Sequence, residues 1–165
     1  MDNHWEGTAY YNTCLLAIFN YTNCLPDHPY LPNDARSVHI LGREYNCLKD
    51  RDIITSRLRS LFWMTYRKGF APIVMQKGPS SDTGWGCMHR CGQMLLVEAM
   101  TRVHLGADWL WTPECRNETY SQIRRMFQDQ RSSLYSIQNI TTLGLAVDKP
   151  IGSWFGPNTV AQVIN

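Results

Sequence analysis

The residues with the clearest chemical potential lie in one stretch, Gly84-Trp85-Gly86-Cys87-Met88, near the middle of a 165-residue chain. Glycine, proline and serine keep residues 78–86 out of regular structure, whereas apolar residues from Cys87 onward follow helical spacing. Cys87 is therefore predicted to open a helix that is buried on most of its surface. At a helix start, free N–H groups and the helix dipole favour a thiolate over a thiol. This position indicates a nucleophile, and the competing interpretation is a small buried packing residue.

Neighbouring residues extend this chemistry. The flanking glycines leave the sulfur approachable, Trp85 supplies an aromatic wall beside it, and the backbone N–H of Cys87 can stabilise an oxyanion. Cys91 lies one helical turn beyond Cys87 on the same face, where it is a candidate resolving thiol for an oxidised Cys87. Parallel Cβ vectors strain such a disulfide, so a packing cysteine is the alternative interpretation of Cys91.

A cysteine nucleophile needs a histidine, and the spacing excludes those near it. His89 follows Cys87 by two residues and points roughly 200° away around the helix. His104 lies about 25 Å along the same helix. The remaining histidines, His4, His28 and His39, lie in or beside the N-terminal part of the chain. We therefore expect no histidine of this sequence to reach Cys87.

The elements that precede the central stretch set its surroundings. A short helix near residues 11–21 and an extended, proline-containing linker are predicted for the first 36 residues. Residues 38–45 favour a strand with a turn at glycine. Asp50 is predicted to cap a helix that ends near residues 66–69, which places Tyr66 at its C-terminal end.

Helices also dominate the second half of the sequence. The helix that begins at Cys87 is expected to run to about residue 104, and residues 118–130 form an amphipathic pattern. The charges of that second helix, Asp129 among them, are predicted to face water. A short helix is expected over residues 136–143, and Asn158 is predicted to cap a last helix.

The central stretch resembles the active-site segment of the autophagins, papain-like cysteine peptidases that process a ubiquitin-like autophagy modifier. The matching residues are Ser81-Asp82-Thr83-Gly84-Trp85-Gly86-Cys87-Met88 and Arg90-Cys91-Gly92-Gln93-Met94. The resemblance extends from Ile40-Leu41-Gly42-Arg43 through Thr65-Tyr66-Arg67-Lys68 to Ile151-Gly152-Ser153-Trp154-Phe155-Gly156-Pro157-Asn158-Thr159, roughly three quarters of the chain. It implies an α+β, papain-like fold, of which this chain would hold mainly the helical half.

The resemblance also implies roles for individual residues. The hydroxyl of Tyr66 would be a second oxyanion donor, and the alternative is a core tyrosine. Trp154, with Trp85, would line the narrow entrance that admits the C-terminal glycine of the substrate, and the alternative is hydrophobic packing under a loop. The acid and base of the family lie in an Asp-Pro-His segment that this sequence lacks, and His89 replaces an expected aliphatic residue.

From this resemblance, residues 37–165 are interpreted as the N-terminal part of a truncated peptidase domain, and residues 1–36 as an extension and linker. The implied function is a cytoplasmic thiol endopeptidase of autophagy. It would cleave the modifier after its C-terminal glycine and release it from phosphatidylethanolamine, although this chain alone should be inactive. The alternatives are a non-catalytic shortened form that binds the modifier and a redox pair formed by Cys87 and Cys91.

Composition excludes several other classes of function. A net charge of +2 and a charged fraction of 18% favour neither nucleic acid nor an anionic membrane as a partner. The sequence shows no targeting or transmembrane segment. Its six cysteines form no Cys-x-x-Cys pair, which favours reduced thiols. His89 diverges from Cys87 and Cys91 around a helix, so no metal site is predicted, and no cofactor is implied.

Overall fold

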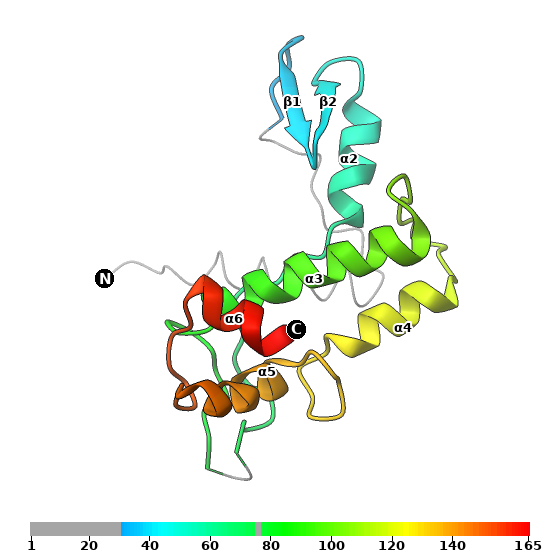
Figure 1. Cartoon of the computed structure of the whole chain (residues 1–165). Helices are drawn as coiled ribbons and strands as arrows, with labels where there is room; N and C mark the ends of the chain where they lie inside the picture. The colour runs from blue at the N-terminus through cyan, green and yellow to red at the C-terminus, as the bar shows by residue number, and fades with distance from the viewer. Residues whose placement is uncertain (1–30, 75–76) are drawn as a thin grey trace. The chain divides into compact units, whose positions relative to one another are not determined.

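The computed structural model describes residues 31–74 and 77–165. The helix predicted near residues 11–21 lies outside this range, as do His4 and His28. The described part is mostly helical and contains a small two-stranded sheet (Figure 1). The chain divides into two compact units, Met1–Phe62 with Asp108–Cys115 and Trp63–Ala107 with Arg116–Asn165.

A hairpin and a helix make up the described first unit. Strands β1 (Ser37–Ile40) and β2 (Arg43–Asn46) are antiparallel, and Val38 pairs with Tyr45. Leu41 and Gly42 both have positive φ values, 50° and 83°, as the tight turn between two twisted strands requires. The predicted strand and turn are therefore confirmed as a hairpin.

Helix α2 (Arg51–Ser60) is shorter than predicted, and the placement of Tyr66 at its end was wrong. Leu61 is already extended, with φ −79° and ψ 136°. The residues that follow are largely aromatic or β-branched, which favours extended backbone. Beyond Tyr66, the chain pairs with the stretch before α3: Asp82 N donates to Arg67 O over 3.1 Å. These bonds replace the helical ones, so Tyr66 lies in an extended segment.

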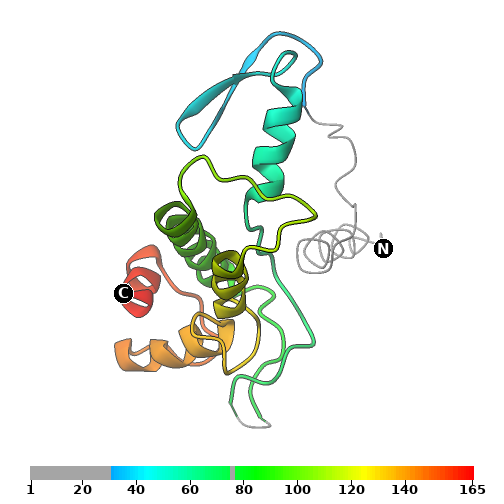
Figure 2. The same ribbon diagram turned by 90° about the vertical axis from the view of Figure 1, so that its right-hand side faces the viewer.

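Four helices and one 3₁₀ turn are described in the second unit. They are α3 (Cys87–Leu105), α4 (Glu118–Met126), α5 (Ile137–Leu143), η1 (Gly144–Val147) and α6 (Pro157–Ile164). Helices α4, α5 and α6 all contact α3, and both views show α6 (red) beside the first turns of α3 (Figures 1 and 2). The approach of α6 to α3 depends on Gly92, because a Cβ atom there would lie 2.7 Å from Val160 Cγ2.

Apolar side chains form two small clusters in this second unit. One contains Phe70, Ile73 and Ile137, with Trp85 and Ile151 packed against it. The other consists of Ile140, Phe155 and Val160, with partly buried neighbours that include Met88 of α3. The second cluster brings the loop before α6 to the beginning of α3.

The prediction that α3 is buried on most of its surface was wrong. Leu95 and Val103 are 74% and 78% exposed, whereas Arg90 and Gln93 are buried. Gln93 Nε2 donates to Tyr135 O over 2.6 Å, which satisfies the amide on the protein side. The helix therefore buries a polar stripe because that stripe has partners.

The second amphipathic helix also differs from its prediction. Helix α4 ends at Met126, and Phe127 at its C-cap is fully buried together with the apolar face that the sequence predicted. Asp129 lies beyond the helix, and its side chain is only 10% exposed because it pairs with Arg67 and Arg90. Its assignment to a solvated face was therefore wrong.

The last helix begins earlier than expected. Gly156 is the N-cap of α6 and Pro157 occupies its first turn, so Asn158 is inside the helix and is not its cap. Proline suits the first helical position, because its missing N–H would have no helical partner there. No helix among the described residues combines the length and apolar character that crossing a membrane requires.

Candidate active site

Cys87 is the first residue of α3 and is partly exposed. A tight turn leads into it, since the backbone N–H groups of Trp85 and Gly86 donate to Asp82 O over 3.2 and 2.8 Å. Gly86 is the N-cap, and its carbonyl accepts from Arg90 N over 3.0 Å. The thiol therefore stands at the positive end of a helix of 19 residues.

Trp154 reaches the thiol from the loop before α6. Its indole Nε1–H donates to Cys87 Sγ over 3.1 Å, although the residue is 55% exposed. Phe155, the next residue, is fully buried in the cluster with Ile140 and Val160. This buried anchor holds the loop while the tryptophan covers the sulfur.

Tyr66 approaches the thiol from the extended segment after α2. An interaction between its hydroxyl and the Cys87 thiol is one of the causes of the raised pKa of Tyr66. The pKa of Tyr66 is raised, first by burial, then by the hydrogen bond and negative charge of Cys87 and by the charge of Asp82. The phenol therefore stays protonated and can donate a hydrogen bond at neutral pH.

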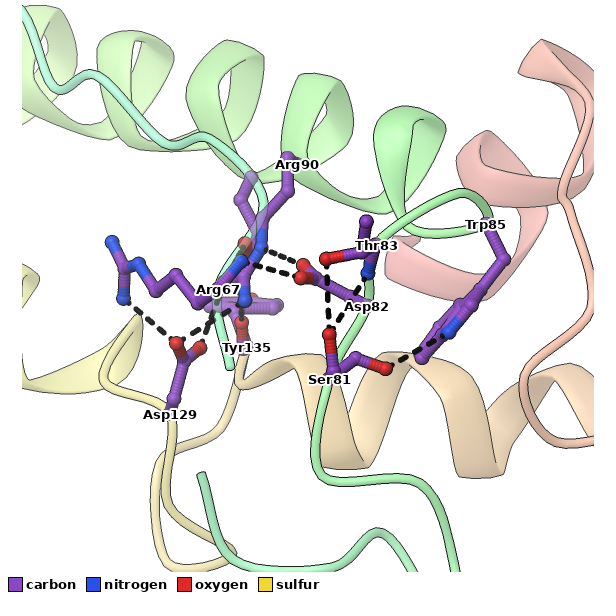
Figure 3. A network of polar contacts seen from close by, with 9 residues as sticks. Arg67, Ser81, Asp82, Thr83, Trp85, Arg90, Asp129 and Tyr135 are labelled. Atoms are coloured by element: carbon purple, nitrogen blue, oxygen red, sulfur yellow. Dashed lines mark hydrogen bonds and ion pairs between the residues drawn. The ribbon is translucent and has the colours of Figure 1, made fainter. Parts of the chain in front are cut away.

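A buried network of two carboxylates and two guanidinium groups joins the segment after Tyr66 to helix α3 (Figure 3). Arg90 Nε donates to Asp82 Oδ2 over 2.6 Å, and Arg90 Nη1 donates to Asp129 Oδ1 over 2.8 Å. Asp129 also accepts from Arg67 Nη1 over 2.8 Å. Asp82 is fully buried, and Arg90 is 2% exposed. The charges cancel, as burial of ions requires.

The arginines determine the charge state of Asp129. Burial alone would raise its pKa, but Arg90 and then Arg67 hold the pKa of Asp129 below its ordinary value. The carboxylate is therefore ionised at neutral pH. The sequence analysis predicted no role at the site for any of these four residues, although Arg90 and Gln93 stand at i and i+3 on a helix that begins with Cys87. This polar stripe on the helix was the sequence signal from which the network could have been predicted.

His89 is fully buried and takes no part in the network. Its ring lies 3.9 Å from the Phe155 ring, centroid to centroid, and edge-to-face against Trp85. Neither ring nitrogen has a hydrogen-bond partner among the described residues. Burial, and then the charge of Arg90, lowers the pKa of His89 to about 4. The imidazole is therefore neutral near pH 7.

Trp85 is partly buried and anchored by a hydrogen bond, whereas Cys91 is exposed. Trp85 is anchored by its indole N–H, which donates to Ser81 O over 3.0 Å, and its ring packs against Phe70, Ile73 and Ile137 (Figure 3). Cys91 is exposed, one turn beyond Cys87 on α3. Both thiols are free.

The described histidines do not form a base for Cys87. The thiol's partners in residues 31–74 and 77–165 are Trp154 and Tyr66. His104 lies in the last turn of α3, at the opposite end from Cys87, and His39 lies in β1. The same part of the chain holds no group of three or more histidine, cysteine, aspartate or glutamate residues arranged for a metal ion.

Comparison with known proteins places this geometry in a family context. Residues 51–165 match the peptidase C54 catalytic domain. Cysteine protease ATG4A of Xenopus laevis is 48% identical over 135 residues, covering 81% of this chain and 34% of the relative. Cysteine protease ATG4B of Gallus gallus is 42% identical over 149 residues, covering 90% and 38%. Human cysteine protease ATG4A is 41% identical over 145 residues, covering 87% and 35%. The chain thus spans about a third of the length of the curated relatives it matches.

Proposed function

The chain belongs to the peptidase C54 family of ATG4 cysteine proteases of autophagy, and on that premise we propose that it carries the nucleophile of a cytoplasmic thiol endopeptidase. The substrate is a ubiquitin-like autophagy modifier, which the enzyme cleaves after its C-terminal glycine and releases from phosphatidylethanolamine. The fold of the whole enzyme is papain-like. Residues 37–165 are the N-terminal part of its peptidase domain, and residues 1–36 precede that domain.

In the proposed reaction, the Cys87 thiolate attacks the carbonyl carbon of the glycine after which the modifier is cleaved. The oxyanion that forms accepts hydrogen bonds from the backbone N–H of Cys87 and from the hydroxyl of Tyr66. The carbon–nitrogen bond then breaks, and the leaving amine takes a proton from a histidine. Water hydrolyses the remaining thioester and regenerates the thiol.

The single observation that carries this proposal is the convergence of two donors on one thiol at a helix start. Trp154 Nε1 lies 3.1 Å from Cys87 Sγ, and the interaction of the Tyr66 hydroxyl with the same thiol contributes to the raised pKa of Tyr66. A half-exposed indole over the sulfur leaves room for a narrow, extended chain, which suits glycine. Trp85 supplies the wall on the other side of the entrance.

The base and the acid that orients it come, in this proposal, from the part of the relatives that this chain does not cover. The supporting observation is that no described histidine is a partner of Cys87. The same observation favours a second candidate function, a non-catalytic form that binds the modifier. The two differ in whether the rest of a relative, added to this chain, restores cleavage.

Cys91 carries a separate proposal, reversible oxidation. It is exposed one turn from Cys87, so it can attack a sulfenic acid on Cys87, releasing water and forming a disulfide. A thiol reductant reverses the step. In the whole enzyme, Cys91→Ser should abolish the reductant-dependent recovery of activity after peroxide; unchanged recovery would refute this role.

A covalent probe tests the nucleophile and the substrate class together. The probe is the ubiquitin-like modifier with a vinyl methyl ester in place of its terminal glycine carboxylate. We expect one adduct, mapped by mass spectrometry to Cys87, and no adduct in Cys87→Ala. Ubiquitin with the same electrophile is the control. Equal labelling by ubiquitin, or an adduct on another cysteine, would contradict the proposal.

A further inference from the structure

Asp82 occupies a position between the two segments that carry Tyr66 and Cys87. Its side chain is fully buried, and each carboxylate oxygen has its own donor (Figure 3). Oδ1 accepts from the backbone N–H of Arg67 over 2.5 Å, and Oδ2 accepts from Arg90 Nε over 2.6 Å. No other carboxylate in the described residues joins a backbone N–H of the Tyr66 segment to a side chain of α3.

The backbone of Asp82 strengthens this junction. Its N–H donates to Arg67 O over 3.1 Å, so Arg67 is bonded to Asp82 at both its N–H and its carbonyl. Its carbonyl accepts from Trp85 N and Gly86 N. Arg67 follows Tyr66 directly, and Gly86 precedes Cys87 directly. One residue therefore holds the backbone beside the phenol and the backbone beside the thiol.

The sequence of the turn is adapted to this carboxylate. A Cβ atom on Gly86 would lie 2.6 Å from Asp82 Cβ and 2.9 Å from Asp82 Oδ2. Glycine is therefore required at the N-cap of α3 by a close approach, since φ is an ordinary −81° there. The Asp82 side chain therefore lies directly against the residue that precedes Cys87.

Asp129 and Arg90 fix the carboxylate from the other side. The guanidinium of Arg90 is planar and bonds Asp82 through Nε and Asp129 through Nη1 and Nη2. Asp129 also bonds the side chain of Arg67. Arg90 therefore links Asp82 rigidly to α3, and a lysine at this place would keep the charge but lose the fork of donors.

We propose that Asp82 is a positioning residue that sets the Tyr66 hydroxyl against the Cys87 thiol, and the importance of that pair rests on the proposed function. Asp82 touches neither the substrate nor the thiol, and it acts through Arg67 and Gly86. Its removal should uncouple the two groups while leaving both in the chain. The coupling between them is measurable without proteolysis.

The experiment is a double-mutant cycle on thiol reactivity in the 165-residue chain. The rate of Cys87 alkylation by iodoacetamide at pH 7 is measured by mass spectrometry, with and without Tyr66→Phe. In the unchanged protein we expect Tyr66→Phe to slow alkylation by about fivefold, because a hydroxyl hydrogen bond favours the thiolate. In Asp82→Asn the effect of Tyr66→Phe should fall below about twofold.

Thr83→Ala is the matched control, because Thr83 lies in the same loop and, among the described residues, its hydroxyl has Ser81 as its partner. It should retain the full effect of Tyr66→Phe. An equal effect in Asp82→Asn and in Thr83→Ala would overturn the proposal, as would the absence of any effect in the unchanged protein. If circular dichroism shows Asp82→Asn to be unfolded, Arg90→Lys is judged by the same criterion. Unfolding of both variants would also count against positioning.

The outcome of the double-mutant cycle does not depend on the outcome of the modifier-labelling experiment that tests the proposed function. Loss of modifier labelling with an intact cycle would contradict the substrate but keep the role of Asp82. Normal modifier labelling with an unchanged cycle in Asp82→Asn would contradict only the role of Asp82.

Discussion

The indole N–H of Trp154 donates a hydrogen bond to the Sγ atom of Cys87 over 3.1 Å, across 67 residues of sequence. The donor is about half exposed, whereas the residue after it, Phe155, is fully buried. Because the anchor and the donor are adjacent, the indole can be altered without disturbing the core. This contact is therefore open to a clean test.

Trp154→Phe should slow alkylation of Cys87 at pH 7 by about threefold to tenfold, because the smaller phenyl ring keeps an aromatic group but lacks the N–H donor. The melting temperature should change little, since the side chain is largely outside the core. Trp63→Phe, at a tryptophan that is equally exposed, is the control and should leave the rate unchanged. An unaltered rate in Trp154→Phe would show that the contact does not influence the thiol.

Cys87 should be the most reactive of the described thiols, although Cys91 is the more exposed. Helix position, not access, decides this order, because only Cys87 meets the free N–H groups of the first turn. Iodoacetamide at pH 6, followed by peptide mapping, should label Cys87 before Cys91 and Cys115, and the buried Cys47 last. Earlier labelling of Cys91 would mean that exposure dominates.

His89 should make the folded state sensitive to acid. Burial, and then the charge of Arg90, lowers the pKa of His89 from 6.5 to about 4. Between these values the unfolded chain binds a proton that the folded chain does not, so stability falls as the pH falls from 6.5 towards 4. The loss from this one group should reach about 3 kcal/mol.

Urea unfolding of the unchanged chain and of His89→Leu, at pH 7, 5.5 and 4.5, measures this effect. The stability of His89→Leu relative to the unchanged chain should rise at each step toward lower pH. His104→Leu, at an exposed position on the same helix, is the control and should show no such trend. A difference between His89→Leu and the unchanged chain that is constant with pH would contradict the account of His89.

Gly144 lies directly against the buried ring of Phe155, the residue after Trp154. A Cβ atom there would lie 2.2 Å from Cζ of Phe155, whose ring packs on His89. Gly144→Ala should therefore destabilise the chain by about 1–3 kcal/mol through overpacking. Gly156→Ala is the matched control, since its Cβ would meet Trp154 at an ordinary 3.8 Å, and it should cost less than about 1 kcal/mol. Equal unfolding free energies for the two variants would refute this packing argument.

Local signals in the sequence predicted the parts of the fold that depend on neighbouring residues. The start of α3 at Cys87 follows from the change from a glycine-rich loop to helical spacing, and the hairpin turn follows from Gly42 between two β-compatible runs. The family resemblance likewise rested on a contiguous motif. These features need no knowledge of distant contacts.

Long-range pairing determined the parts that were predicted wrongly. Asp129 has the sequence context of a solvated charge, and only the approach of Arg67 and Arg90 makes it a buried one. Tyr66 leaves the helical pattern because Arg67 pairs with Asp82, 15 residues later. Helical spacing gives the faces of α3 but not which of them finds partners. Helical spacing therefore identified the Cys87 thiol as a candidate nucleophile, but it did not identify the buried charge network nearby.

Cleavage of the ubiquitin-like modifier with a C-terminal extension tests the central claim most directly. The purified 165-residue chain is assayed alone and after mixing with the part of Xenopus laevis ATG4A that it does not cover. We predict no turnover by the chain alone, because no described histidine reaches Cys87, and turnover in the mixture that disappears with Cys87→Ala. Turnover by the chain alone that Cys87→Ala abolishes would contradict the account, because a base for Cys87 would then have to lie within these 165 residues.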